Sequence, residues 1–204
     1  VIRLQEKVAE MLGKEAGLFV PSGTMSNAVA VRTHTQPGDE IVAEEYSHLY
    51  VYEGGGYAAL SGCSMALVPS SNGIIDPVEL RKRIRKSKGS RSHYPNASLI
   101  CIENTSNRGG GTFYPFETLK EVGEVAKDTE CKLHLDGARL FNAVESCGQD
   151  AKSITSMFDS ISVCLSKGLG APVGSVLVGS HAFIDQAHRW RKMFGGGMRQ
   201  SGII

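Results

Sequence analysis

One lysine stands between two strand-like runs, where its amine could act as a nucleophile. An apolar run covers residues 161–165, Lys167 and a glycine-rich segment follow, and a second apolar run covers residues 176–178. This pattern predicts strand, tight turn and strand, with Lys167 as the only charge. Small and apolar surroundings would partly desolvate the ammonium and favour an amine that forms Schiff bases with carbonyl compounds. The alternative is an ordinary surface lysine on a turn.

A carboxylate and an arginine follow another predicted strand, residues 132–135. Asp136 ends this run, and Arg139 comes just before a helical segment that starts at Leu140. In a site for pyridoxal 5'-phosphate (PLP), such an aspartate binds the protonated pyridine nitrogen and keeps the ring an electron acceptor. Alternatively, Asp136 caps the next helix and Arg139 is a surface residue, slightly disfavoured by the helix dipole. We expect His134 to be packed rather than catalytic.

The segment Ser22-Gly23-Thr24 precedes a helical run. Small hydroxylated residues and glycine at a helix start leave backbone N–H groups free, and the helix dipole favours an anion such as a phosphate. A simple helix cap is the alternative, and the P-loop motif is absent.

His48 lies among tyrosines just before the triple glycine of residues 54–56. It could stack on a planar cofactor within reach of a proton, or it could be a packed histidine in an aromatic cluster. Polar residues 103–108 follow the buried strand predicted over residues 97–102, at the place where α/β sheets bind ligands.

Strand-like runs alternate with helical runs along the chain, which predicts an α/β protein with a mainly parallel sheet. We find no internal repeat and no linker, so residues 1–204 are interpreted as one domain. Helices are expected at residues 1–12, 76–86, 116–127 and 180–193. A nucleic-acid patch is one reading of the six basic residues between 81 and 88, but a solvated helix face suits a chain of net charge +1 better.

The five cysteines are odd in number and form no CxxC pair, which favours a reducing compartment over a disulfide framework. The sequence has no signal peptide and no apolar run long enough to span a membrane. We therefore expect a cytoplasmic protein. The 24 glycines, without low complexity, suggest tight turns and close approach of the backbone to a ligand.

Six segments of the chain form a recognisable set: residues 21–24, 47–48, 103–105, 134–143, 162–175 and 191–200. Together they resemble one enzyme family, the low-specificity L-threonine aldolases of the β-eliminating lyase group, which are fold type I PLP enzymes. The resemblance spans essentially the whole chain and implies the seven-stranded-type, mainly parallel sheet of the large PLP-binding domain, with a lysine-bearing hairpin.

The resemblance also implies a role for each candidate residue. Lys167 would be the Schiff-base lysine, Asp136 would pair with the pyridine nitrogen, and His48 would stack on the ring. A second active-site histidine would be His93, ten residues before Glu103. The cofactor would also be bound by Ser22, Gly23, Thr24, Arg139 and Ser166, and the substrate by Arg139 and Arg199. No metal site is expected.

The chain also departs from the family pattern. Ser106 stands where many members carry histidine. The family's opening segment, with a serine that helps to hold the substrate carboxylate, and its smaller C-terminal domain are not recognisable. We therefore expect the cofactor half of the site to be more complete than the substrate half.

The resemblance implies retro-aldol cleavage of L-threonine or L-allo-threonine to glycine and acetaldehyde, with His48, His93 or a water as base. One alternative is another type I PLP lyase or an aminotransferase. Another is a PLP-fold remnant without turnover. The family's members are homodimers or homotetramers. Four tyrosines around the triple glycine independently indicate an interface: Tyr46, Tyr50, Tyr52 and Tyr57.

Overall fold

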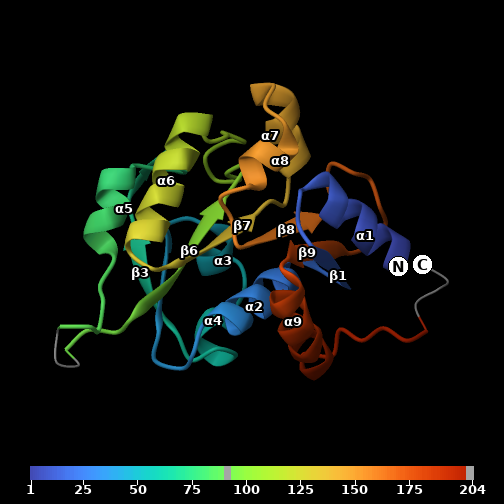
Figure 1. Ribbon diagram of the computed structural model, residues 1–204, viewed down its shortest axis with the longest axis horizontal. Coiled ribbons are helices and arrows are strands. Elements are labelled where there is room, and N and C mark those ends of the chain that lie inside the picture. Colours follow the sequence, from blue (N-terminus) through green and yellow to red (C-terminus); the bar gives the residue numbers. More distant parts are fainter. Residues whose placement is uncertain (90–92, 201–204) are drawn as a thin grey trace.

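The computed structural model describes residues 1–89 and 93–200, and a seven-stranded sheet runs through this part of the chain (Figure 1). The strand order is β1-β9-β8-β7-β6-β2-β3. The bounds are β1 Ala16–Val20, β2 Glu40–Glu44, β3 Ser64–Val68, β6 Ala97–Glu103, β7 Lys132–Asp136, β8 Ser160–Cys164 and β9 Ser175–Gly179, and a separate two-stranded hairpin pairs β4 Ser70–Ser71 with β5 Ile74–Ile75.

The sheet is mainly parallel, as the alternation of runs predicts. Strands β3, β2, β6, β7 and β8 pair in parallel, and β9 is antiparallel to both of its neighbours, β8 and β1. The carboxyl ends of β6, β7 and β8 therefore meet at one edge of the sheet, where α/β folds bind ligands.

The connection between β8 and β9 differs from the expected tight turn. It is a loop over residues 165–174 that carries Lys167. The loop folds on itself, because Ala171 N donates to Leu165 O at 3.0 Å and Gly170 N donates to Lys167 O at 3.0 Å. The expected lysine-bearing hairpin is present, but its loop is too long for a two-residue turn.

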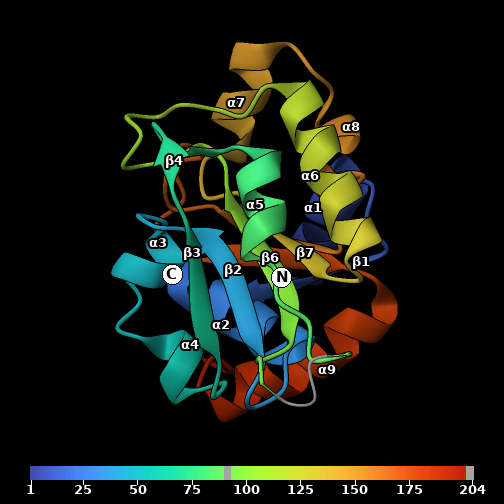
Figure 2. The same ribbon diagram turned by 90° about the vertical axis from the view of Figure 1, so that its left-hand side faces the viewer.

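Helices cover both faces of the sheet (Figures 1 and 2). Helices α1, α5, α6, α7 and α8 lie on one face, and α2 and α9 pack together on the other, with α3 and α4 beside them. The bounds are α1 Ile2–Met11, α2 Gly23–His34, α3 His48–Val51, α4 Gly56–Ala59, α5 Pro77–Arg83, α6 Phe116–Asp128, α7 Leu140–Cys147, α8 Ala151–Thr155 and α9 His181–Met193.

Capping side chains explain where several of these helices begin. The side chains of Ser22, Asp76, Asp150 and Ser180 each accept a hydrogen bond from a backbone N–H in the first turn of the helix that follows. Helix α5 also has Pro77 at its first position, where a missing N–H costs nothing.

Helix α5 ends at Arg83, before the expected end at Lys86, because the next basic residues bind the sheet. Arg85 forms an ion pair with buried Glu40 at the start of β2, and Lys86 Nζ donates to Ala97 O at 2.6 Å. Arg81 pairs with Asp128 on α6. Arg81, Arg85 and Lys86 therefore contact other parts of the fold, while Arg81, Lys82 and Arg83 are exposed, as expected of a solvated helix face.

The core lies on both faces of the sheet, whose central strands are almost wholly buried. One cluster packs α1, α5, α6 and α7 on β6, β7 and β8, and a second packs α2 and α9 on β1 and β9. Among the described helices, none has the length and apolar character needed to cross a bilayer.

Candidate active site

A small pocket opens at the carboxyl edge of the sheet, where β6 and β7 end. Its volume is about 140 Å³, and four of the candidate residues line it. They come from different parts of the chain, which the parallel sheet brings to one edge. The lining residues are His48, Glu103, Asn107, Asp136, Ala138, Arg139 and Lys167.

Asp136 is the last residue of β7 and is 8% exposed. Its Oδ2 accepts a hydrogen bond from Asn27 Nδ2 at 2.8 Å, and its Oδ1 accepts one from Ala138 N at 3.1 Å. Helix α7 begins at Leu140 with Arg139 at the N-cap, so the interpretation of Asp136 as that helix's cap is wrong. The carboxylate is instead fixed by donors at the edge of the sheet.

His48 begins the short helix α3 and is held at both its backbone and its ring. Its backbone N donates to Glu103 Oε2 at 2.8 Å, and its Nδ1 lies 2.9 Å from Glu53 Oε1. The hydrogen bond to Glu53 raises the pKa of His48 above its usual value, against the opposing effect of burial. A half-buried imidazole with a raised pKa is a stronger base than an ordinary histidine side chain.

Lys167 and Arg139 bring positive charge to the rim of the pocket. Arg139 is half-buried, and Lys167 is exposed on its loop. The expected desolvation of Lys167 is therefore wrong for this single chain, because the small residues of the loop are too short to cover the amine. Its amine is free to reach a ligand in the pocket.

The start of α2 lies beside the carboxyl end of β8. A Cβ on Gly23 would come within 2.8 Å of Cys164 Sγ, so close packing excludes a larger residue there. Ser22 Oγ accepts from Met25 N at 3.1 Å, so the capping interpretation of Ser22 is confirmed. Ser22 and Thr24 are exposed and Gly23 is half-buried, and the first N–H groups of a helix attract anions.

The structure does not bring three other candidates into the pocket. His93 is exposed in the segment before β6, and roughly 20 Å of strand separates that end of β6 from Glu103. Arg199 is exposed beyond the end of α9, and Ser166 is exposed beside Lys167. Within one chain, His93 cannot share the pocket with His48.

Comparison with known proteins identifies the family. All of residues 1–204 match the family model of the beta-eliminating lyases. The chain belongs to the beta-eliminating lyase family. Its homologues include the low-specificity L-threonine aldolase 1 of Arabidopsis thaliana, 47% identical over 99% of this chain, and the low-specificity L-threonine aldolase of Escherichia coli K12, 45% identical over 98% of it.

The chain spans 57% and 59% of the lengths of these two relatives, which is little more than half. Among solved structures, the threonine aldolase of Leishmania major matches with a TM-score of 0.82 at 23% identity, over 92% of this chain and 55% of that one. A structure of SPT with PLP matches with a TM-score of 0.69 at 18% identity, over 91% of this chain and 43% of that one. The fold is that of the type I PLP enzymes.

The surroundings of Asp136 fit the cofactor that beta-eliminating lyases use. Burial raises the pKa of Glu53 and of Glu103 above their usual values, and the nearby charge of Asp136 raises both further. Three carboxyl groups in one partly buried region create a site that favours a cation. A protonated pyridine nitrogen is such a cation, and it would relieve their mutual repulsion.

Sequence interpretation missed two residues that hold the candidate residues of this chain in place. Asn27 and Glu53 are 2% and 8% exposed and are joined by a hydrogen bond of 2.7 Å between Asn27 Nδ2 and Glu53 Oε1. Glu103 Oε1 also accepts from Asn107 N at 3.0 Å. The sequence signal that could have found them is a polar residue in a segment where a buried helix face or the end of a strand is expected.

Proposed function

We propose that the protein is a PLP-dependent carbon–carbon lyase that cleaves L-threonine or L-allo-threonine to glycine and acetaldehyde. The observation that carries this proposal is the meeting of Lys167, Asp136, His48 and Arg139 in one pocket of about 140 Å³. The kinship with L-threonine aldolases supports this substrate class over another type I lyase or an aminotransferase.

Different residues at the carboxyl edge of the sheet would hold different parts of the cofactor. Lys167 would bind its aldehyde carbon, and Asp136 would bind the protonated ring nitrogen. The start of α2, at Gly23 and Thr24, would receive the phosphate, and Arg139 would face the ring hydroxyl and the substrate carboxylate. When bound, PLP supplies an electron sink for the carbanion that remains at Cα after the Cα–Cβ bond breaks.

His48 is the histidine that this chain places at the pocket, and we propose it as both the ring-stacking residue and the base. It would take the proton of the β-hydroxyl group while acetaldehyde forms, and Cα would then gain a proton to give glycine. The reaction moves protons and breaks one carbon–carbon bond, so it needs no oxidant. Glu53 orients the imidazole by holding Nδ1 at 2.9 Å.

We also propose that the protein works as a homodimer or homotetramer in the cytoplasm. Tyr46, Tyr50 and Tyr52 are 53%, 36% and 48% exposed, and the rings of Tyr50 and Tyr57 lie 6.2 Å apart. Exposed aromatic side chains that gather on one surface are common at subunit interfaces. A partner chain could also bring its own His93 or Arg199 toward a neighbouring pocket.

A coupled assay for acetaldehyde tests the function directly. Purified protein with PLP and L-threonine should release acetaldehyde and glycine in equal amounts, and L-allo-threonine should be tested in parallel. Release of pyruvate or ammonia would favour another lyase, and transfer of the amino group to a keto acid would favour an aminotransferase. PLP binding without any product would support a remnant that keeps its cofactor but has no turnover.

A further inference from the structure

A line of buried polar side chains connects Asp136 to the opposite edge of the sheet. Asn27 Nδ2 donates to Asp136 Oδ2, and Asn27 Oδ1 lies 3.2 Å from His134 Nε2. His134 Nδ1 lies 2.8 Å from Ser160 Oγ, which lies 2.8 Å from His34 Nε2. We call Asn27, His134, Ser160 and His34 the directed chain. The members from Asn27 to Ser160 are buried among strands β7 and β8 and helix α2.

Hydrogen-bond chemistry fixes the direction of every link. The two N–H groups of Asn27 face carboxylate oxygens, of Asp136 at 2.8 Å and of Glu53 at 2.7 Å, so its Oδ1 must accept. His134 Nε2 therefore carries the hydrogen. Burial, together with nearby His34, lowers the pKa of His134 to about 3, so the ring is neutral and its Nδ1 is an acceptor.

The same reasoning extends to the outer end. The hydroxyl of Ser160 has one hydrogen, which it donates to His134 Nδ1, so Ser160 Oγ must accept from His34 Nε2. Burial lowers the pKa of His34 to about 4, against the charge of Asp159, so this ring is neutral as well. Both histidines then hold their proton on Nε2.

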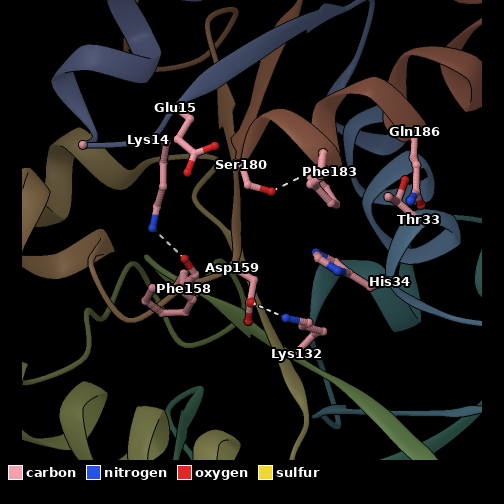
Figure 3. Close-up of a pocket in the computed structure, with 13 residues that line it drawn as sticks. Lys14, Glu15, Thr33, His34, Lys132, Phe158, Asp159, Ser180, Phe183 and Gln186 are labelled. Carbon is pink, nitrogen blue, oxygen red and sulfur yellow. Dashed lines mark hydrogen bonds and ion pairs between the residues drawn. The ribbon is translucent and has the colours of Figure 1, made fainter.

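His34 ends the directed chain at a hollow of about 440 Å³, shown in Figure 3. Its ring stacks on Phe183, with centroids 4.5 Å apart, and the nearby charges of Lys132 and Asp159 pair with each other at 2.8 Å. Packing thus fixes the ring of His34, while the carboxylates of Asp136 and Glu53 fix the amide of Asn27 at the other end of the directed chain. Every donor in between points toward Asp136 and Glu53.

We propose that the directed chain, from His34 through His134 to Asn27, positions the ionised carboxylate of Asp136 for the ring nitrogen of PLP. Its members are positioning residues, because they act through Asp136 and do not line the pocket of Lys167. Without His134 as a donor, the Asn27 amide could turn its oxygen toward the carboxylates and repel them. This inference rests on the proposed function for the identity of the group that Asp136 binds.

Nuclear magnetic resonance of protein with ¹⁵N-labelled histidine tests the direction of the chain and needs neither PLP nor a variant. His34 and His134 should both be neutral, with the proton on Nε2, from about pH 6 to about pH 8. A proton on Nδ1 of His134, or a cationic ring in that range, would overturn the proposal.

Ser160→Ala tests the effect on the cofactor. It removes the link between the two histidines, so spectroscopic titration should show PLP affinity reduced about five- to tenfold. Ser98→Ala is the matched control, because Ser98 also lies at the start of a parallel strand and its buried hydroxyl has no hydrogen-bond partner among the described residues. PLP affinity should be unchanged in Ser98→Ala.

Three outcomes separate the positioning role of the directed chain from the proposed function. Unchanged PLP affinity in folded Ser160→Ala overturns the positioning role alone and leaves the proposed function standing. Failure of the unaltered protein to bind PLP overturns the proposed function, and the positioning role with it, although the histidine signals still report the direction of the chain. An equal loss of PLP affinity in Ser160→Ala and Ser98→Ala would show that general destabilisation, and not the lost hydrogen bond, causes the effect, and would also overturn the positioning role.

Discussion

The neighbours of Asp136 indicate its role. It accepts from a side-chain amide and a backbone N–H, and it lies beside two carboxyl groups whose pKa values are raised. This arrangement orients the carboxylate and places it close to two further carboxyl groups, with Arg139 and Lys167 at the rim of the pocket. A cationic ligand is the simplest way to complete it.

Asp136→Ala should reduce PLP affinity by about ten- to hundredfold, because a hydrogen bond to a charged group is lost. The free energy of unfolding without PLP should change far less, since the variant also relieves repulsion with Glu53 and Glu103. Absorbance titration with PLP and urea unfolding measure the two quantities.

The control for this variant is Asp159→Ala. Asp159 also accepts from a backbone N–H, that of Leu133 at 2.9 Å, but at the opposite edge of the sheet. The Asp159→Ala variant should have a lower free energy of unfolding and an unchanged PLP affinity. If Asp136→Ala behaved in the same way, Asp136 would have a structural role only.

Glu53→Gln should move the acid limb of the activity profile to lower pH. Glu53 raises the pKa of His48 through their hydrogen bond, and a base must be neutral to act, so activity falls as the pH drops through that pKa. The glutamine keeps an oxygen to accept from Asn27 but carries no charge. The pH dependence of kcat/KM for acetaldehyde release measures the shift.

Glu124→Gln, an exposed change on α6, is the control and should leave the profile in place. An acid limb that stayed fixed in Glu53→Gln would show that another group, such as a bound water, is the base.

At the scale of helices and strands, the sequence predicts those elements that are determined by local residue patterns. Capping residues and periodicity place α6 and α9 and the starts of α2 and α5, and apolar runs place β6, β7 and β8 within one residue of their observed bounds. The short helices α3 and α4 and the β4–β5 hairpin lack such signals. They are held by contacts with distant segments, such as the bond from Glu103 to His48, which no local pattern contains.

The same limit applies to the site. Residues in strand-end or glycine-rich segments, such as Asp136 and Lys167, could be found from their position and their resemblance to a family. Asn27 and Glu53 could not, because their function depends on each other across the fold. The exposure of Lys167 also could not be predicted, since nothing in its segment indicates how far the loop stands from the sheet.

Gly23→Ala should lower the free energy of unfolding by about 1–3 kcal/mol, because its Cβ would meet Cys164 Sγ at 2.8 Å. The start of α2 would also shift, so PLP affinity should fall. Gly56→Ala is the matched control at the first turn of α4, where the nearest atom is 3.8 Å away. Its stability should be unchanged or up to about 1 kcal/mol higher. Similar urea midpoints for the two variants would contradict this packing argument.

At the scale of the whole molecule, the residues proposed to hold the cofactor meet in one pocket of this chain, while His93 lies far from that pocket. The exposed tyrosines make association the simplest way to bring further groups to it. Tyr50→Ser should therefore weaken self-association at least about tenfold, if Tyr50 is an anchor of the interface.

Light scattering at several micromolar concentrations measures this effect. Tyr94→Ser, which changes a tyrosine 52% exposed outside the cluster, should not alter the assembly. A stable PLP-bound monomer of the unaltered protein would contradict the proposed homodimer or homotetramer.

The central claim is that Lys167 holds the cofactor, and borohydride reduction followed by peptide mass mapping tests it most directly. Reduction of the yellow, PLP-loaded protein should leave a pyridoxyl group on the peptide that contains Lys167. Lys167→Ala should be colourless and carry no such group, because the site has lost its nucleophilic amine. A pyridoxyl group on another lysine, or one trapped on the chain of Lys167→Ala, would contradict the account.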